Sequence, residues 1–344
     1  MAGKYKMVTS RRAGKTLVTG ATGFVGSHLV ELLVKKGERV VCIAFNRDPV
    51  NHLQPEIRKH PRVEVVVGDI RNPAFVEKAM RGCSKVYHLA ATLNNPSIPY
   101  MEFHSTNVEG TRNIMEAAVK LGVKKVVHTS TVATIKETTK RVDETYRYKG
   151  YFDGPYALTK YKGEKIAFEY GAQGLEVTVL NPTIIYGPRE THSLGAIFRN
   201  YIQPKVRFVG FKDSVLNLIY VEDAAEGFVR AMERGRPGHR YILGGPEMSL
   251  GQFVAILDEV SGTRKPVITI PSFLLEIAVL IFEPLMSVIG LHPPIIKAQI
   301  TAMKRGSAVD ISKARRELGV PERPVKEGVK KSLEWYRLTG YIKY

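Results

Sequence analysis

A chain of 344 residues, 44% hydrophobic and 24% charged, has the composition of an ordinary globular protein and can form a large α/β domain with a smaller partner. Its formal net charge is +18, but Lys and Arg are scattered through the expected helices. The basic and aromatic runs, helix-turn-helix and zinc patterns of nucleic-acid-binding proteins are missing. The basic first fifteen residues lack the apolar core of a secretory signal, and Cys42 and Cys83 lack metal-ligand spacing. We therefore expect a cytoplasmic protein with reduced thiols that binds neither metal nor nucleic acid.

Three glycines dominate the N-terminal part of the chain. The segment 20–26, GATGFVG, follows a short apolar run at 16–19 that predicts a buried strand, and it leads into a helix ending near Lys36. At such a turn the first glycine permits the bend, the second lets backbone N–H groups approach a pyrophosphate, and the third lets the helix pack closely on the strand. The pattern predicts a dinucleotide site, with a purely structural turn as the alternative.

Three further apolar runs, at 39–45, 63–67 and 85–91, predict parallel strands. No acid ends the first, and Arg47 lies just beyond it, which favours the 2′-phosphate of NADP unless Arg47 is only a solvated loop charge. Asp69 follows the second strand and is predicted to accept the adenine amino group, or else to cap the helix at 73–81. Small residues close the third strand and let the backbone pass near a ribose, while His88 is expected in the core.

Hydroxyl groups and a tyrosine–lysine pair follow in the next part of the chain. The loop at 92–105 has the proline and asparagine content of a substrate-facing segment, and a helix is expected at 106–121. A fifth strand at 123–131 ends in HTST. A helix then begins at Pro155 and places Tyr156 and Lys160 one turn apart, where the ammonium can lower the pKa of the phenol. A solvated Tyr and Lys at the same spacing is the alternative.

In this order the motifs resemble the extended short-chain dehydrogenase/reductase superfamily, of the NAD-dependent epimerase/dehydratase type. The resemblance continues through 181–187, NPTIIYG, and 220–223, YVED, to 312–319, SKARRELG, and so covers nearly the whole chain. The chain looks most like the dihydroflavonol reductase and 3β-hydroxysteroid dehydrogenase-like branch, together with hopanoid-associated epimerase-like proteins. The implied fold is α/β: a basic tail at 1–14, a Rossmann-type doubly wound parallel sheet at 15–180, and a smaller, mostly helical substrate-binding portion at 181–344, with some segments returning to the Rossmann domain.

The resemblance also implies roles for individual residues. Tyr156 is the general acid/base, Lys160 holds the nicotinamide ribose and tunes Tyr156, and Thr131 anchors the substrate oxygen, with Ser130 as a possible substitute. The implied contacts to NADP or NAD are Gly20, Thr22, Gly23, Phe24, Val25, Gly26, Arg47, Asp69, Ile70, Leu89, Ala90, Ala91, Tyr156, Lys160, Pro182 and Thr183. The implied substrate contacts are Thr92, Thr131 and Tyr186. By analogy with the family, a homodimer forms through the helices that contain Asn107 and Tyr156.

Two departures from the family pattern bear on the substrate. Val132 and Ala133 stand where nucleotide-sugar dehydratases have an acid pair, and Leu216 stands where epimerases have an arginine that holds a diphosphate. The sequence therefore favours an NAD(P)-dependent oxidoreductase that interconverts a hydroxyl and a ketone on an apolar or lipid-like small molecule. The alternatives are a sugar or nucleotide-sugar epimerase with tightly held NAD, and a redox-sensing binding protein without turnover.

One apolar run lies in the C-terminal part, at 273–290. It contains only two charges, Glu276 and Glu283, and Pro284 interrupts it. Two acids and a proline argue against a membrane-spanning helix, which needs about 20 predominantly apolar residues. Three alternatives remain: a cap over an apolar substrate cleft, a contact with a membrane surface, or an ordinary packing helix.

Overall fold

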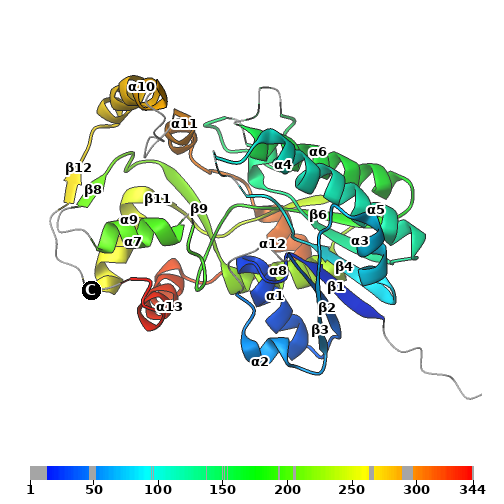
Figure 1. Ribbon diagram of the computed structural model, residues 1–344. Coiled ribbons are helices and arrows are strands. Elements are labelled where there is room, and N and C mark those ends of the chain that lie inside the picture. The colour runs from blue at the N-terminus through cyan, green and yellow to red at the C-terminus, as the bar shows by residue number, and fades with distance from the viewer. Residues whose placement is uncertain are drawn as a thin grey trace, which may run out of the picture.

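The computed structural model describes most of the chain. The described ranges are 14–45, 52–93, 95, 97–136, 138–148, 150, 152, 154–192, 194–203, 207–262, 267–288 and 297–342. They form a larger α/β lobe and a smaller lobe beside it, and the carboxyl ends of the central strands face the smaller lobe (Figure 1).

The larger lobe is built on a seven-stranded parallel sheet in the order β10-β6-β5-β4-β1-β2-β3. Its strands are β1 Lys15–Thr19, β2 Val40–Ala44, β3 Val63–Val67, β4 Cys83–His88, β5 Lys125–Thr129, β6 Glu176–Pro182 and β10 Arg240–Leu243. The chain winds outward from β1 to β3 on one side and from β4 to β10 on the other. The order therefore reverses between β1 and β4, which is where doubly wound sheets bind their ligands.

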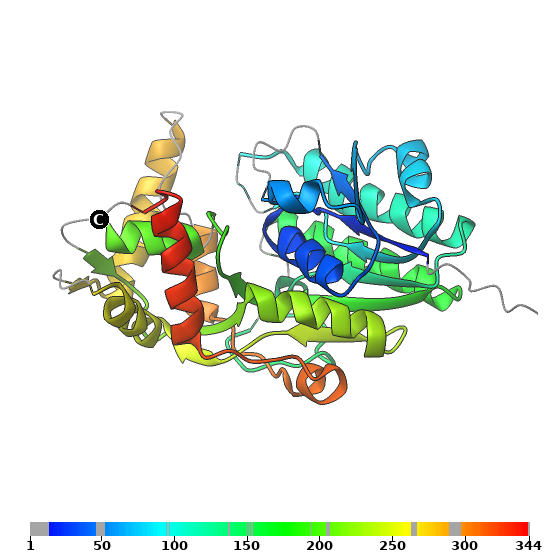
Figure 2. The same ribbon diagram turned by 90° about the horizontal axis from the view of Figure 1, so that it is seen from below.

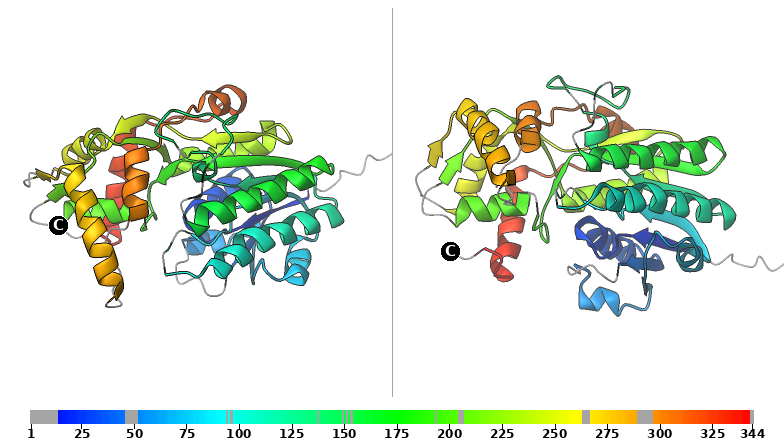
Figure 3. Two further views of the ribbon diagram at one scale, coloured as in Figure 1. Left: turned by 90° about the horizontal axis from the view of Figure 1, so that it is seen from above. Right: turned by 45° about the horizontal axis from the view of Figure 1, so that its top comes forward.

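Helices cover both faces of this sheet because its strands are apolar on both sides. One face carries α1 Phe24–Lys35, α8 Val221–Arg234 and α12 Ser312–Leu318 (Figure 2). The other carries α3 Pro73–Met80, α5 Gly110–Lys120 and α6 Pro155–Ala172 (Figure 3, left). In β5, Val127 belongs to the first core and Val126 to the second. The predicted Rossmann-type α/β fold is confirmed.

Several shorter elements depart from the sequence prediction. The short helix α2, Pro55–Arg58, precedes β3. Helix α4, Tyr100–His104, occupies the end of the predicted loop at 92–105. A π-helical turn, Ser105–Glu109, leads into α5, and a 3₁₀ turn, Val132–Thr134, follows β5.

Cys42 and Cys83 are free and buried, and burial raises their pKa values to about 12 and about 11.

The smaller lobe has its own sheets and core. Its strands are β7 Ile184–Tyr186, β9 Val215–Tyr220 and β11 Glu247–Ser249, in the order β11-β9-β7, and β8 Arg207–Val209 paired with β12 Val267–Thr269. Its helices are α7 Leu194–Ile202, α9 Leu250–Ser261, α10 Ser272–Val288, α11 Lys297–Arg305 and α13 Val325–Leu338. Phe198, Phe253 and Tyr336 meet at its centre, and Phe24 and Val25 of α1 pack against this core. The start of α1 thus joins the two lobes.

Parts of the C-terminal half return to the larger lobe. After β9 the chain forms α8 on the sheet, then β10 at the sheet edge, and α12 later packs on α8 and β10. In the described ranges, no helix combines the length and the apolar character that crossing a bilayer requires.

Candidate functional site

The glycine turn forms a narrow backbone cradle between β1 and α1. Gly20 has φ +66°, and a Cβ at this position would lie 2.9 Å from the amide nitrogen of Ala90. A Cβ on Gly26 would lie only 2.0 Å from the carbonyl oxygen of Gly20. Gly23 donates its N–H to the same oxygen at 3.1 Å and is the N-cap of α1. Side chains would fill this cradle, so the glycines fit a bound pyrophosphate at the helix N-terminus.

A buried network holds the end of β4 against this turn. Thr19 Oγ1 accepts the N–H groups of Leu89 and Ala90 at 3.1 and 3.0 Å, and donates its proton to His88 Nδ1 at 2.8 Å. His88 Nε2 donates to Thr111 Oγ1 at 3.0 Å, because that hydroxyl donates to a main-chain carbonyl at 2.8 Å. Burial lowers the pKa of His88 to about 3, so the ring is neutral. His88 thus lies in the core as predicted and orients the segment predicted to pass the ribose.

The predicted adenosine end lies beyond β3. Asp69 accepts the N–H of Arg71 at 2.9 Å and forms an ion pair with its guanidinium at 2.6 Å. The N-cap of α3 is Asn72, so the alternative that Asp69 caps this helix is wrong, while the predicted contact of Asp69 with adenine stays a prediction. The sequence did not point to Arg71 as a residue of this end of the site. Its guanidinium lies 5.8 Å from the centre of the Phe45 ring. Arg47 lies outside the described residues.

The other predicted cofactor residues fall near the same sheet edge. Ile70 is buried, and its side chain packs where a Cβ on Gly110 would otherwise lie. Thr183 follows β6 and donates its N–H to the carbonyl of Leu243 at 3.0 Å. The remaining predicted contacts stand in the glycine turn, directly after β4 or at the end of β6: Thr22, Phe24, Val25, Leu89, Ala91 and Pro182.

An asparagine ties the loop after β4 to the tyrosine helix. Asn107 Oδ1 accepts the N–H of Thr92 at 2.8 Å, and Asn107 Nδ2 donates to the carbonyl of Thr92 at 3.2 Å. The same amide nitrogen donates to Thr159 Oγ1 on α6 at 3.1 Å. The predicted substrate residue Thr92 is thereby held beside α6.

Tyr156, Lys160 and Thr131 come together where β5 and α6 meet. A hydrogen bond joins the side chains of Tyr156 and Thr131 and favours the phenolate, but burial is the larger effect and raises the pKa of Tyr156. Lys160 Nζ donates to the carbonyl of Thr129, and burial lowers its pKa to about 8. The prediction that Lys160 lowers the pKa of Tyr156 is not met in the protein alone, since desolvation dominates both groups.

The two candidate hydroxyls at the end of β5 point to different partners. Ser130 is 3% exposed, and its Oγ donates to Glu164 Oε2 on α6. Thr131 begins the 3₁₀ turn, where its Oγ1 accepts the N–H of Ala133 at 3.3 Å and also meets Tyr156. The geometry therefore brings Thr131, and not Ser130, to the phenol.

Tyr186 does not have the position predicted for a substrate contact. It is 1% exposed, donates its hydroxyl proton to the carbonyl of Val325 at 3.4 Å, and packs edge-on against Tyr220. A Cβ on Gly328 of α13 would lie 2.3 Å from the Tyr186 oxygen. This prediction is corrected, because packing under α13 buries the side chain in the core of the smaller lobe.

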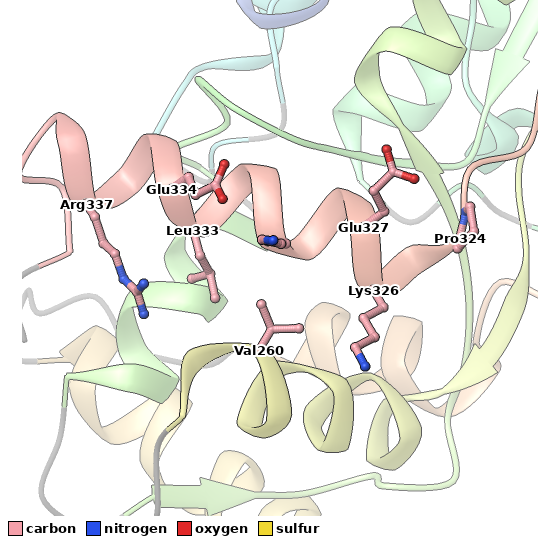
Figure 4. A pocket seen from close by; sticks show the side chains of 8 residues that line it. Val260, Pro324, Lys326, Glu327, Leu333, Glu334 and Arg337 are labelled. Atoms are coloured by element: carbon pink, nitrogen blue, oxygen red, sulfur yellow. The ribbon is translucent and has the colours of Figure 1, made fainter.

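A groove of about 500 Å³ lies in the smaller lobe between α9 and α13 (Figure 4). Val260 and Leu333 face each other across it, with Lys326 near one end and Arg337 near the other. None of the predicted catalytic or cofactor residues lines it, and we assign it no role in the chemistry.

The glycine cradle lies at the switch point between β1 and β4, and Thr131, Tyr156 and Lys160 meet at the end of the neighbouring strand β5. This combination defines a Rossmann protein of the short-chain dehydrogenase/reductase type. Residues 16–244 match the NAD dependent epimerase/dehydratase family, and the chain belongs to this family. It is therefore an NAD(P)-dependent enzyme of the extended short-chain type.

Similar proteins include reductases, dehydrogenases and epimerases. A dihydroflavonol 4-reductase-like protein of Synechocystis sp. is 31% identical over 335 residues, covering 95% of each chain. A 3-beta-hydroxysteroid dehydrogenase of Mycolicibacterium neoaurum is 29% identical over 323 residues, covering 89% of this chain and 86% of its own. A UDP-glucose 4-epimerase of Thermotoga maritima, solved with UDP-glucose, is 25% identical with a TM-score of 0.77, covering 94% of this chain and 99% of the other.

Proposed function

We propose that this protein interconverts a hydroxyl and a ketone on an apolar or lipid-like small molecule, with NADP favoured over NAD as its cofactor. The observation that carries the proposal is the contact between the hydroxyls of Thr131 and Tyr156 beside the buried Lys160, at the sheet edge that the glycine cradle shares. The likeness to a 3-beta-hydroxysteroid dehydrogenase supports the class of substrate.

The proposed mechanism assigns one step to each of three side chains. Thr131 donates a hydrogen bond to the substrate oxygen and orients it toward Tyr156. Tyr156 takes the hydroxyl proton during oxidation and returns it during reduction, a role that contributes ~100- to 10,000-fold in rate. Lys160, fixed by the carbonyl of Thr129, holds the nicotinamide ribose. The nicotinamide of a bound dinucleotide would accept the hydride from the substrate carbon during oxidation and supply it during reduction.

Residues near this site favour an apolar substrate over a sugar nucleotide. Val132 and Ala133 follow Thr131, so the acid and base of a sugar dehydratase are not supplied there. Leu216, at the position of the epimerase arginine, packs against the apolar core of the smaller lobe. A diphosphate therefore gains no charged partner at this position.

A cofactor and substrate panel tests the proposal. We expect a 3β-hydroxysteroid or another apolar secondary alcohol to reduce NADP⁺, measured as the rise of nicotinamide absorbance, with NAD⁺ as the slower cofactor. The epimerase alternative predicts instead that the purified protein carries tightly bound NAD and converts UDP-glucose without net reduction of added cofactor. Failure to oxidise or reduce any member of the panel would leave the redox-sensing binding protein.

We also propose that α10 binds an anionic lipid surface, the membrane contact considered for the apolar run. Phe273, Leu274, Ile277, Leu280 and Ile281 are each 47–62% exposed on α10, at the edge of the smaller lobe (Figure 3). Their spacing makes one continuous helical face, whereas Glu276 is paired with Lys304 of α11 at 3.0 Å. The net charge of +18 is complementary to anionic lipid.

Vesicle sedimentation tests this contact. Leu280→Asp is expected to weaken binding to phosphatidylglycerol-containing vesicles by about tenfold or more, since it places a charge on the apolar face. Leu338→Asp, on the exposed end of α13, is the matched control and should bind normally. Equal binding by both variants, or a wild-type dimer that Leu280→Asp dissociates, would contradict the proposal. The predicted homodimer through the helices that contain Asn107 and Tyr156 stays a prediction.

A further inference from the structure

Glu164 is a buried carboxylate that the proposed chemistry does not use. It is 2% exposed and lies on α6 one turn after Lys160 and two turns after Tyr156. A carboxylate removed from water is costly unless charged and hydrogen-bonded partners compensate it. Its partners therefore indicate what its burial achieves.

Four side chains surround this carboxylate. Oε2 accepts hydrogen bonds from Ser130 Oγ at 2.5 Å and from Asn181 Nδ2 at 2.9 Å, and it lies 3.0 Å from Thr134 Oγ1. Oε1 faces the guanidinium of Arg240 at 3.3 Å. These partners come from the end of β5, from β6 and from β10. Glu164 thus links α6 to three adjacent strands of the sheet.

The same network encloses Thr131. Ser130 precedes it, and Thr134 closes the 3₁₀ turn that Thr131 begins. Thr134 Oγ1 shares its single proton between Glu164 and the carbonyl of Thr131, which is 2.8 Å away. Asn181 Nδ2 also donates to the Thr131 carbonyl, at 3.2 Å. The carbonyl of Thr131 is therefore held by two side chains, Thr134 and Asn181, that both also contact the carboxylate of Glu164.

The charge of Glu164 also acts on Lys160, one turn earlier on α6. Burial lowers the pKa of Lys160, and the negative charge of Glu164 opposes that effect. From the sheet, His88 and His128 face Lys160, and burial lowers the pKa of both imidazoles, which keeps them neutral. Glu164 is accordingly the anion that acts on this lysine within the described chain.

We propose that Glu164 is a positioning residue that fixes the turn presenting Thr131 to Tyr156 and maintains the charge of Lys160. This inference rests on the proposed function, because it acts through the three residues assigned there. It adds a residue that touches neither substrate nor cofactor. A residue with only a structural role would affect stability without changing the pH dependence of turnover.

Glu164→Gln tests the inference, with Glu169→Gln as control, because Glu169 is an exposed acid on the same helix. We expect Glu164→Gln to lower kcat about tenfold or more, equivalent to ~1.4 kcal/mol, with the KM for the alcohol changed less than about threefold. The alkaline limb of the pH–rate profile should move down by about one unit, since Lys160 loses its counter-charge one turn away. Glu169→Gln should match the wild type.

Glu164→Asp keeps the experiment informative if the glutamine variant does not fold. It retains the charge but withdraws the oxygens from their donors, so kcat should fall while the alkaline limb stays in place. Wild-type kcat and pH profile in Glu164→Gln, while Tyr156→Phe is inactive, would overturn this inference alone. Undiminished activity of Tyr156→Phe would instead overturn the proposed function.

Discussion

Thr131→Val and Ser130→Ala each remove one hydroxyl from neighbouring residues, and the structure gives the two hydroxyls different consequences. Ser130 donates to the buried carboxylate of Glu164, and a hydrogen bond to a charged group contributes ~1.5–3 kcal/mol to stability. Ser130→Ala should therefore lower the free energy of unfolding by about that amount. Its kcat should fall less than about fivefold, because Asn181 and Thr134 still hold the turn.

Thr131→Val should show the opposite pattern. Its hydroxyl meets Tyr156, and losing one such preorganised donor costs about 100-fold in kcat. The stability change should stay near ~1 kcal/mol, because one N–H of the 3₁₀ turn loses its acceptor. Denaturant titration and steady-state kinetics measure both quantities, with Thr131→Ser as the control that retains the hydroxyl. If Ser130→Ala abolished turnover while Thr131→Val left it intact, the assignment of the two hydroxyls would be wrong.

Three further changes test other parts of the account. Gly26→Ala should abolish cofactor binding, measured by calorimetry, because the added Cβ would lie 2.0 Å from a main-chain oxygen. Gly171→Ala is the control and should bind the cofactor normally, because its added Cβ would meet no atom nearer than 3.7 Å. Burial lowers the pKa values of His28 and His88 to about 3, so the unfolded state binds more protons below pH ~6.5. Stability should therefore fall by about 1.4 kcal/mol per histidine for each pH unit below that value, and a flat urea-unfolding profile from pH 6 to 4 would contradict this. Arg47→Ala should weaken NADP binding while leaving NAD unchanged; equal weakening of both would exclude a phosphate contact.

The fold was accessible from the sequence because its signals are local. Short apolar runs and the glycines at 20, 23 and 26 follow from strand burial and turn sterics, which need no knowledge of distant residues. The same reasoning placed Tyr156 and Lys160 on one helix face, since a helical turn fixes that spacing.

The network under the site was not accessible in this way. Glu164 obtains its partners from β5, β6 and β10, so its role depends on strand order and not on any spacing along the chain. Tyr186 belongs to the segment 181–187, which resembles the family motif. Its burial depends on packing against α13, which lies far along the chain. The prediction of a lowered pKa for Tyr156 was wrong for a related reason, because desolvation depends on the complete packing around the phenol.

The central claim is that the phenol of Tyr156 transfers the substrate proton, and Tyr156→Phe tests it most directly. With the best alcohol from the panel, we predict a rate at least about 100-fold below the wild type, while the Kd for NADP changes by less than about threefold. A Tyr156→Phe variant that binds NADP and turns over at the wild-type rate would contradict the account.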